Sequence, residues 1–472
     1  MDEITTNAPR ATIALPADEM ERSDLSARRS WAIVLAALLA AVLLYYVLPF
    51  GAAPRKGLAL LLFVAVLWLT EAIHVTITAI LIPVGALALG FSGVDTKRAL
   101  ASFGDPIIFL FFGGFALSTA LRVQKLDRKI AVWLMSLADA HLGVVALLLF
   151  VVTALLSMWI SNTATVAMML PLVLGVLSTL DCQKDRNAFT FVLLGIAYAA
   201  SIGGLGTLVG SPPNAIAAKA LNLNFADWMM FGLPLVLVLL PLMVLALWLV
   251  LRPDLSRSVE LTRDTIDWTP QRVLTMLVFA ATALAWMLGD WVAEALNITS
   301  QDTFIALAAA AAIAILRLAS WRQIAENTDW GVLFLFGGGL ALSDLLKTSG
   351  AAAVLGEQMG ALLGGAHPLL VILGVALFIA VLTEFASNTA SAALLVPVFA
   401  AVARQMGMAE TALVLIIGVG ASCAFMLPVA TPPNAIVFGT GHIRQRDMLR
   451  AGGLLNGFCV LLLGLWGYFV LL

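Results

Sequence analysis

Two kinds of short polar motif interrupt the apolar stretches of this sequence, and each kind occurs twice. Ser-Asn-Thr stands at 161–163 and again at 387–389. Pro-Pro-Asn stands at 212–214 and again at 432–434. A Pro-Pro pair removes two backbone donors, so a regular helix cannot continue through it. The broken backbone exposes carbonyls which, with hydroxyl and amide oxygens, make the all-oxygen surroundings that a hard cation such as Na⁺ prefers.

The same groups can also bind an anion. Asn amides, Ser and Thr hydroxyls and the N-termini of broken helices all donate to a carboxylate. No Lys or Arg stands within any of the four motifs. A cation bound beside the anion would therefore have to supply the positive charge. The motifs predict coupled binding, since each ion lowers the cost of desolvating the other.

These polar groups also have plainer interpretations. Ser, Thr and Asn in membrane helices often only bond to neighbouring helices, and a Pro-Pro pair can be a simple kink. The recurrence of both motifs favours binding. Ser157 and Thr383, each four residues before a Ser-Asn-Thr motif, are either cation ligands or hydroxyls bonded to their own helix. Glu384 is either a functional group or a structural hydrogen-bonding partner.

The composition shows what kind of element must position these motifs. Of 472 residues, 62% are hydrophobic and only 11% are charged, against about 25% charged in soluble domains. A soluble enzyme, a disordered chain and a nucleic-acid binder are therefore excluded. The three Cys and four His make no metal or disulfide spacing, and neither H-E-x-x-H nor G-x-S-x-G occurs. We expect a polytopic membrane protein without enzymatic activity or organic cofactor, with lipid as its surroundings.

The motifs recur in the same order in two halves of the chain. A third match pairs residues 110–117 with 335–342. The spacing of about 220 residues is far too long for a solenoid. The predicted organisation is a cytoplasmic tail over 1–30, an N-terminal span over 31–54, a first repeat over 55–251 with a hairpin at 143–178 and a broken helix at 189–219, and a second repeat over 268–472 with a hairpin at 367–403 and a broken helix at 410–440.

The predicted fold is an all-α polytopic membrane protein of eleven spans. After one N-terminal span, each half has five transmembrane helices and one re-entrant hairpin. A polar hairpin tip at membrane depth requires burial in protein or a watery cavity. Because five is odd, the halves have inverted topology. A cytoplasmic N-terminus and a periplasmic or extracellular C-terminus then place most of the 26 Lys and Arg residues inside. Inverted repeats with broken helices are typical of secondary transporters.

The paired Ser-Asn-Thr and Pro-Pro-Asn motifs resemble the signature of the divalent-anion:sodium symporter family. Residues 200–214 and 383–390 especially resemble the bacterial INDY-type dicarboxylate transporters. The likeness covers nearly the whole chain after residue 30. It implies an elevator-type homodimer, in which a transport domain moves against a scaffold domain.

The resemblance also implies which residues bind the ions. It implies one Na⁺ site at Ser157, Ser161, Asn162 and the carbonyl of Gly210. It implies a second Na⁺ site at Thr383, Ala386, Asn388 and the carbonyl of Ala430. It places the substrate carboxylates at Asn162, Thr163, Asn388 and Thr389, with Ser211, Pro212, Thr431 and Pro432 close by.

We therefore expect Na⁺-coupled import of C4-dicarboxylates such as succinate, fumarate and malate across a bacterial inner membrane. The hydroxyls of Ser157 and Thr383 favour coupling to sodium. Dicarboxylate exchange without Na⁺, and symport of citrate or sulfate, remain open. An anion channel is a further alternative, but it needs a continuous polar lining, whereas this sequence offers two local half-sites.

Overall fold

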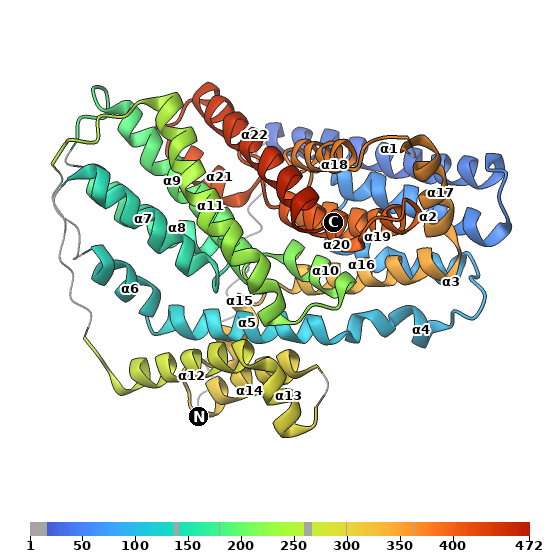
Figure 1. Cartoon of the computed structure of the whole chain (residues 1–472), viewed down its shortest axis with the longest axis horizontal. Coiled ribbons are helices and arrows are strands. Elements are labelled where there is room, and N and C mark those ends of the chain that lie inside the picture. Colours follow the sequence, from blue (N-terminus) through green and yellow to red (C-terminus); the bar gives the residue numbers. More distant parts are fainter. Residues whose placement is uncertain (1–16, 136–140, 179, 259–266, 299, 364) are drawn as a thin grey trace, which may run out of the picture.

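The computed structural model describes residues 17–135, 141–178, 180–258, 267–298, 300–363 and 365–472. Over these ranges the protein is helical and has no β-strand (Figure 1). The helices of the first half are α1 (Ala17–Val47), α2 (Ala52–Thr70), α3 (Val75–Ala88), α4 (Thr96–Ala101), α5 (Pro106–Val123), α6 (Leu126–Met135), α7 (Leu142–Ser157), α8 (Asn162–Leu177), α9 (Arg186–Gly203), α10 (Pro212–Leu221) and α11 (Phe225–Leu251).

The second half contains a similar series. Its helices are α12 (Pro270–Met287), α13 (Gly289–Leu296), α14 (Gln301–Ile315), α15 (Trp321–Asn327), α16 (Trp330–Thr348), α17 (Ala351–Leu363), α18 (Pro368–Leu382), α19 (Asn388–Gln405), α20 (Glu410–Gly420), α21 (Pro432–Phe438) and α22 (Gln445–Phe469). Two 3₁₀ turns, η1 (Ser102–Gly104) and η2 (Gly204–Gly206), precede α5 and follow α9.

Among the described residues, eight helical stretches are long and apolar enough to cross a membrane. The number rises to ten if the pairs α13–α14 and α17–α18 each count as one broken span. Eleven spans therefore stays a prediction. The first of these helices, α1, packs on α2 and leaves most of its apolar surface uncovered, with Leu39 68% and Tyr46 75% exposed. Most of the predicted tail, residues 1–16, lies outside the described residues.

Both predicted hairpin ranges contain two helices that are separated at the Ser-Asn-Thr motif. In the first, α7 ends at Ser157 and α8 begins at Asn162; in the second, α18 ends at Leu382 and α19 begins at Asn388. The Ser of each motif caps the helix that follows, because its hydroxyl accepts from the backbone N–H three residues later at 3.4 Å. Each hairpin packs on a broken helix, α7 and α8 on α9, α18 and α19 on α20 (Figure 1).

Both predicted broken helices are interrupted before their Pro-Pro pair. Two prolines begin α10 and two begin α21, where their missing N–H groups need no intrahelical partner. The Asn of each motif closes the break. Asn214 Nδ2 donates to the carbonyls of Gly204 and Thr207 at 2.8 and 2.7 Å. Asn434 Nδ2 donates to carbonyls at the same two offsets, ten and seven residues earlier, at 3.0 and 3.1 Å.

The centre of the molecule is formed by α9 and α20. Every residue of α9 from Ala188 to Gly203 is buried, and so is every residue of α20 from Ala412 to Gly420. Helices that are apolar on all sides belong inside a bundle rather than at its lipid-facing surface. The breaks that follow α9 and α20 therefore lie in the protein interior.

Within the described ranges, the short helices α4, α6, α13, α15 and α17 were not predicted, because none of them contains an apolar run long enough for a span. They pack against the longer helices instead. The ammonium group of Lys129 in α6, for example, lies 4.5 Å from the ring centre of Trp268.

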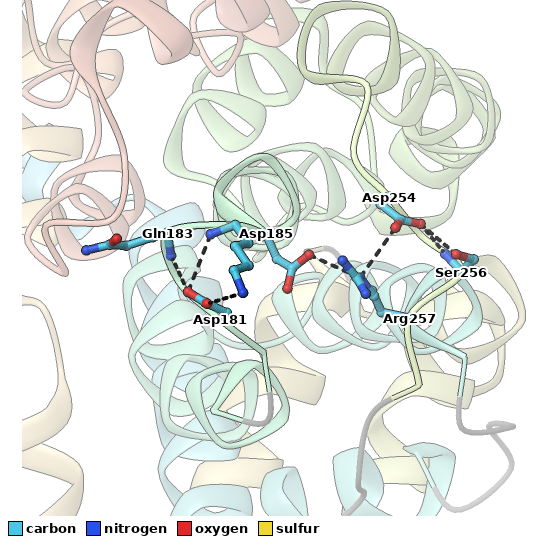
Figure 2. A network of polar contacts seen from close by, with 7 residues as sticks. Asp181, Gln183, Asp185, Asp254, Ser256 and Arg257 are labelled. Atoms are coloured by element: carbon cyan, nitrogen blue, oxygen red, sulfur yellow. Dashed lines mark hydrogen bonds and ion pairs between the residues drawn. The ribbon is translucent and has the colours of Figure 1, made fainter.

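The segment after α11 contacts the start of α7 and the turn before α9. Figure 2 shows its contact with the turn before α9. The first N–H groups of α7 lack partners within the helix. Leu142 N–H donates to the carbonyl of Arg257 at 2.9 Å, and Gly143 N–H donates to that of Leu255 at 3.1 Å. The Arg257 side chain pairs with Asp185 at 3.1 Å and with Asp254 at 3.3 Å. Hydrogen bonds from Ser256 hold the pKa of Asp254 below its usual value.

We predict that Arg257→Ala loosens the start of α7. Arg257 is half-exposed although its partner Asp185 is largely buried, and the contact of this segment with α7 is made by the backbone. Hydrogen exchange of the Leu142 and Gly143 amides should therefore accelerate by no more than about fivefold. Exchange mass spectrometry measures this rate. The matched control is Arg322→Ala, which removes an exposed ion pair to Glu326 in α15. Equal rates at α7 in both variants would contradict the prediction.

Candidate functional site

The two hairpin tips and the two helix breaks surround one cavity of about 750 Å³. A smaller cavity of about 240 Å³ lies elsewhere in the protein. The structure brings together at the wall of the larger cavity all eight residues that the sequence analysis assigned to the substrate: Asn162, Thr163, Ser211, Pro212, Asn388, Thr389, Thr431 and Pro432. Six of the eight residues assigned to Na⁺ line it: Asn162 and Asn388, which were assigned to both ligands, and Ser161, Gly210, Ala386 and Ala430. Ser157 and Thr383 are not part of this wall. Their roles as ligands stay predictions.

Four helix N-termini border this cavity. The helices α8, α19, α10 and α21 begin at Asn162, Asn388, Pro212 and Pro432, and all four of these residues line its wall. The N-terminus of a helix carries a partial positive charge and unpaired N–H groups. Several such ends around one space make a site for negative charge without a Lys or Arg side chain.

The charged side chains at the cavity wall are carboxylates. Glu71, at the end of α2, and Asp329, which caps the start of α16, both line it. No Lys or Arg is among the described residues of the wall. The sequence analysis did not predict Glu71 or Asp329 at this site, because they are far in sequence from the polar motifs. An anion here would need compensating positive charge from a bound cation.

The first hairpin tip contacts the first break through a cluster of oxygens. Ser157, fully buried, donates to Asn162 Oδ1 at 2.7 Å. A Cβ placed on Gly204 would lie 2.6 Å from Asn162 Oδ1 and 3.0 Å from the carbonyl oxygen of Gly210, so both oxygens adjoin this glycine. Ser157, Asn162 and Gly210 thus lie near one another, while Ser161 uses its hydroxyl to cap α8. Gly204 was missed, because nothing in a Gly-Gly pair indicates which glycine meets the tip.

Thr207, also missed, ties the first tip to the first break. Its hydroxyl donates to the carbonyl of Met158 in the tip at 2.5 Å and accepts from the N–H of Gly210 at 3.2 Å. Thr207 is fully buried. This one side chain therefore fixes the position of the Gly210 peptide relative to the tip.

The second tip has a matching cluster. The Thr383 hydroxyl lies 2.7 Å from Asn388 Oδ1 and 2.6 Å from the carbonyl oxygen of Ala421. A hydroxyl has one proton, so it can donate to only one of these two oxygens. One of the two oxygens therefore lacks a proton from Thr383. The carbonyl of Ala421 was not among the predicted ligands; Ala386 and Ala430 line the adjoining cavity wall.

The two breaks touch each other at one point. The hydroxyls of Ser211 and Ser422 lie 3.0 Å apart, and both residues are buried. Ser211 follows Gly210 of the first cluster, and Ser422 follows Ala421 of the second. This hydrogen bond connects the two oxygen clusters across the halves of the chain. Tyr198 of α9 makes another hydrogen bond between the halves by donating to the carbonyl of Phe425 at 2.7 Å.

Glu384 was expected to be either a functional group or a structural hydrogen-bonding partner, and its contacts are structural. Its Oε1 accepts from the N–H groups of Phe425 and Met426 at 2.8 and 2.9 Å, and its Oε2 accepts from that of Leu427 at 3.0 Å. Asn456 Nδ2 donates to Oε1 at 2.8 Å. The carboxylate is buried and satisfies the backbone of the second break. It is not part of the cavity wall described above.

Residues 65–418 match the family described as citrate transporter. The chain belongs to the citrate transporter family. The resemblance to divalent-anion:sodium symporters drawn from the motifs is thereby confirmed, and the chain is a membrane transporter rather than an enzyme.

Relatives cover nearly its whole length. An uncharacterised transporter of Haemophilus influenzae is 53% identical and aligns over 95% of this chain and 98% of its own. The sodium-dependent dicarboxylate transporter SdcS of Staphylococcus saprophyticus is 33% identical, with 88% and 85% of the two chains covered.

Solved transporter structures share the fold. The YdaH transporter of Alcanivorax borkumensis superposes with a TM-score of 0.59 at 14% identity, covering 84% of this chain and 98% of that one. The efflux pump MtrF of Neisseria gonorrhoeae superposes with a TM-score of 0.53 at 13% identity, covering 94% and 95%. At these identities the likeness concerns the fold alone.

We predict that Gly204→Ala destabilises the transporter. The added Cβ would overlap Asn162 Oδ1, so the tip must move away from the break; overpacking of this kind costs about 1–3 kcal/mol. Thermal unfolding of the purified protein measures the loss. Gly175→Ala in α8 is the matched control. It also replaces a helix glycine by alanine, but its added Cβ meets open space. Equal unfolding temperatures in the two variants would exclude the tight approach at Gly204.

Proposed function

We propose that this transporter imports C4-dicarboxylates, such as succinate, fumarate and malate, together with Na⁺ across a bacterial inner membrane. The observation that carries the proposal is the cavity bordered by four helix N-termini and by no Lys or Arg among its described wall residues. Such a wall suits an anion only if a cation accompanies it. The names of the SdcS relatives, sodium-dependent dicarboxylate transporters, agree with this inference.

The substrate carboxylates bind at the two Asn-Thr pairs of the tips. Asn162 and Thr163 serve one carboxylate; Asn388 and Thr389 serve the other. The proposed neighbours at the breaks are Ser211, Pro212, Thr431 and Pro432. Support comes from the position of all eight at one cavity wall, and from amide and hydroxyl donors that need no charge of their own.

Two Na⁺ ions are the proposed coupling ions. One binds at Ser157, Ser161, Asn162 and the Gly210 carbonyl; the other binds at Thr383, Ala386, Asn388 and the Ala430 carbonyl. The oxygen clusters at Asn162 and at Asn388 support these two positions, and the Ala421 carbonyl is a further candidate ligand for the second. Na⁺ binds first and orders the tips, after which the dianion completes the site.

Transport then requires the loaded site to cross the membrane. We propose that the chain forms an inverted repeat of eleven spans. We further propose an elevator motion, in which α7–α11 and α18–α22 move together against the remaining helices. The same pair of Asn hydrogen bonds in both breaks supports the repeat. Neutralisation of the carboxylates by Na⁺ lowers the cost of moving them past the apolar scaffold. A homodimer within the lipid bilayer is the proposed assembly.

One alternative substrate has specific support. The matched family is described as citrate transporter, so citrate is the second candidate for the same site. Exchange of dicarboxylates without Na⁺ is the alternative coupling mode.

Uptake into proteoliposomes tests the function. With an inward Na⁺ gradient, we expect accumulation of radiolabelled succinate that an equal choline gradient does not support and that excess fumarate abolishes. Uptake that ignores Na⁺ but needs internal dicarboxylate would instead establish exchange. Accumulation of labelled citrate, but not succinate, would establish the second candidate.

Asn162→Asp tests the substrate site in the same assay. The variant adds a negative charge between the first oxygen cluster and the proposed carboxylate position, so succinate uptake should fall at least about tenfold. Asn187→Asp is the control, because Asn187 donates to the carbonyl of Leu251 away from the cavity. Normal uptake by a folded Asn162→Asp protein would refute the assignment.

Thr383→Val tests the second cation cluster. The substitution preserves volume but removes the shared hydroxyl oxygen, so the Na⁺ concentration needed for half-maximal uptake should rise about tenfold, since each charge-assisted contact contributes about 1.5 kcal/mol. Thr282→Val in α12, whose hydroxyl bonds only to its own helix at 2.8 Å, is the control. An unchanged Na⁺ dependence would remove Thr383 from the cation site.

A further inference from the structure

A second cavity of about 240 Å³ lies apart from the first, where α10 and α19 meet α16. Apolar residues of all three helices form most of its wall, among them Ile216, Phe336 and Pro397. The polar residues are Lys219 of α10, Asn222 just beyond it, and Ser343 and Lys347 of α16. None of them belongs to the wall of the central cavity.

The two lysines differ in their partners. Lys219 Nζ lies 2.8 Å from Asp105 Oδ2, so its charge is compensated by the residue that caps α5. Within the described part of the chain, Lys347 has no carboxylate at ion-pair distance. The Lys347 side chain is exposed and stands in the last turn of α16, where a cation also offsets the helix dipole. The cavity therefore has at its rim one positive charge without a carboxylate partner, together with hydroxyl and amide donors. This is the opposite of the central cavity, whose charged side chains are carboxylates.

We propose that this second cavity binds a small carboxylate anion without the help of Na⁺. Lys347 supplies the pairing charge, and Ser343 and Asn222 supply hydrogen bonds to the carboxylate oxygens. The volume suits a molecule of a few carbon atoms. The apolar wall, which includes Phe336 and Pro397, covers the carbon chain of such a molecule and would not favour a bare inorganic oxyanion.

The position of the cavity gives such an anion an effect on transport. It would bind at the C-terminal end of α10, whose N-terminal Pro212 lies at the central cavity. An anion held by Lys347 of α16 and by Asn222 next to α10 fastens these two helices together. If α10 moves against α16 during transport, as proposed above, the bound anion opposes that motion. Only this consequence rests on the proposed function; the binding itself does not.

Binding can be measured without transport. The probe is succinate as its choline salt, titrated against the purified full-length transporter in Na⁺-free buffer, with thermal unfolding or calorimetry as the readout. We expect succinate to bind without Na⁺, and to bind equally well to Asn162→Asp, which disturbs only the central site. Lys347→Gln should weaken this binding about tenfold, whereas Lys347→Arg should retain it. Lys97→Gln, an exposed lysine of α4 outside the cavity wall, should change nothing.

Three results would overturn the inference. Absence of Na⁺-independent binding would exclude the site, and unaltered binding by Lys347→Gln would place the anion elsewhere. If inorganic sulfate, added as its choline salt, bound as tightly as succinate, the proposal that the cavity prefers a carboxylate would be contradicted. If uptake of succinate fails in proteoliposomes but binding stays sensitive to Lys347, the second cavity stands and the proposed function falls.

Discussion

The structure depends on one constraint: buried backbone groups must find hydrogen-bond partners where a helix is broken in an interior without water. Asn214 and Asn434 meet it in the same way, each by donating two hydrogen bonds from one amide group to carbonyls that the break has released. Because both side chains are fully buried, these bonds have no competitor.

The two halves satisfy this constraint unequally, which explains the buried Glu384. After α9 the chain continues through a 3₁₀ turn, whereas after α20 it runs from Ala421 to Thr431 without a helix. The second break therefore leaves more N–H groups free. Glu384 accepts three of them, and Asn456 donates to the same carboxylate. A carboxylate in the protein interior here stabilises the backbone of a broken helix.

The paired helix breaks could be predicted from the sequence, because Pro-Pro and Ser-Asn-Thr act on the backbone through local chemistry. The sequence did not predict α17, since a short helix that packs on α2 and α19 needs no long apolar run. Gly204 and Thr207 were missed for another reason: their importance arises from contacts across the tip, which no spacing encodes. Glu71 and Asp329 come to the cavity only through tertiary packing.

The hydroxyl pair of Ser211 and Ser422 has a consequence for the energetics of loading. If cations bind at the two proposed oxygen clusters, a cation that draws in the Gly210 carbonyl would also shift the neighbouring Ser211. Through the 3.0 Å contact between the hydroxyls, that shift would reach Ser422, which follows the Ala421 carbonyl. The two proposed sites would then be thermodynamically linked, and such linkage is reciprocal. A Hill coefficient above one for the cation is the form that such cooperativity takes.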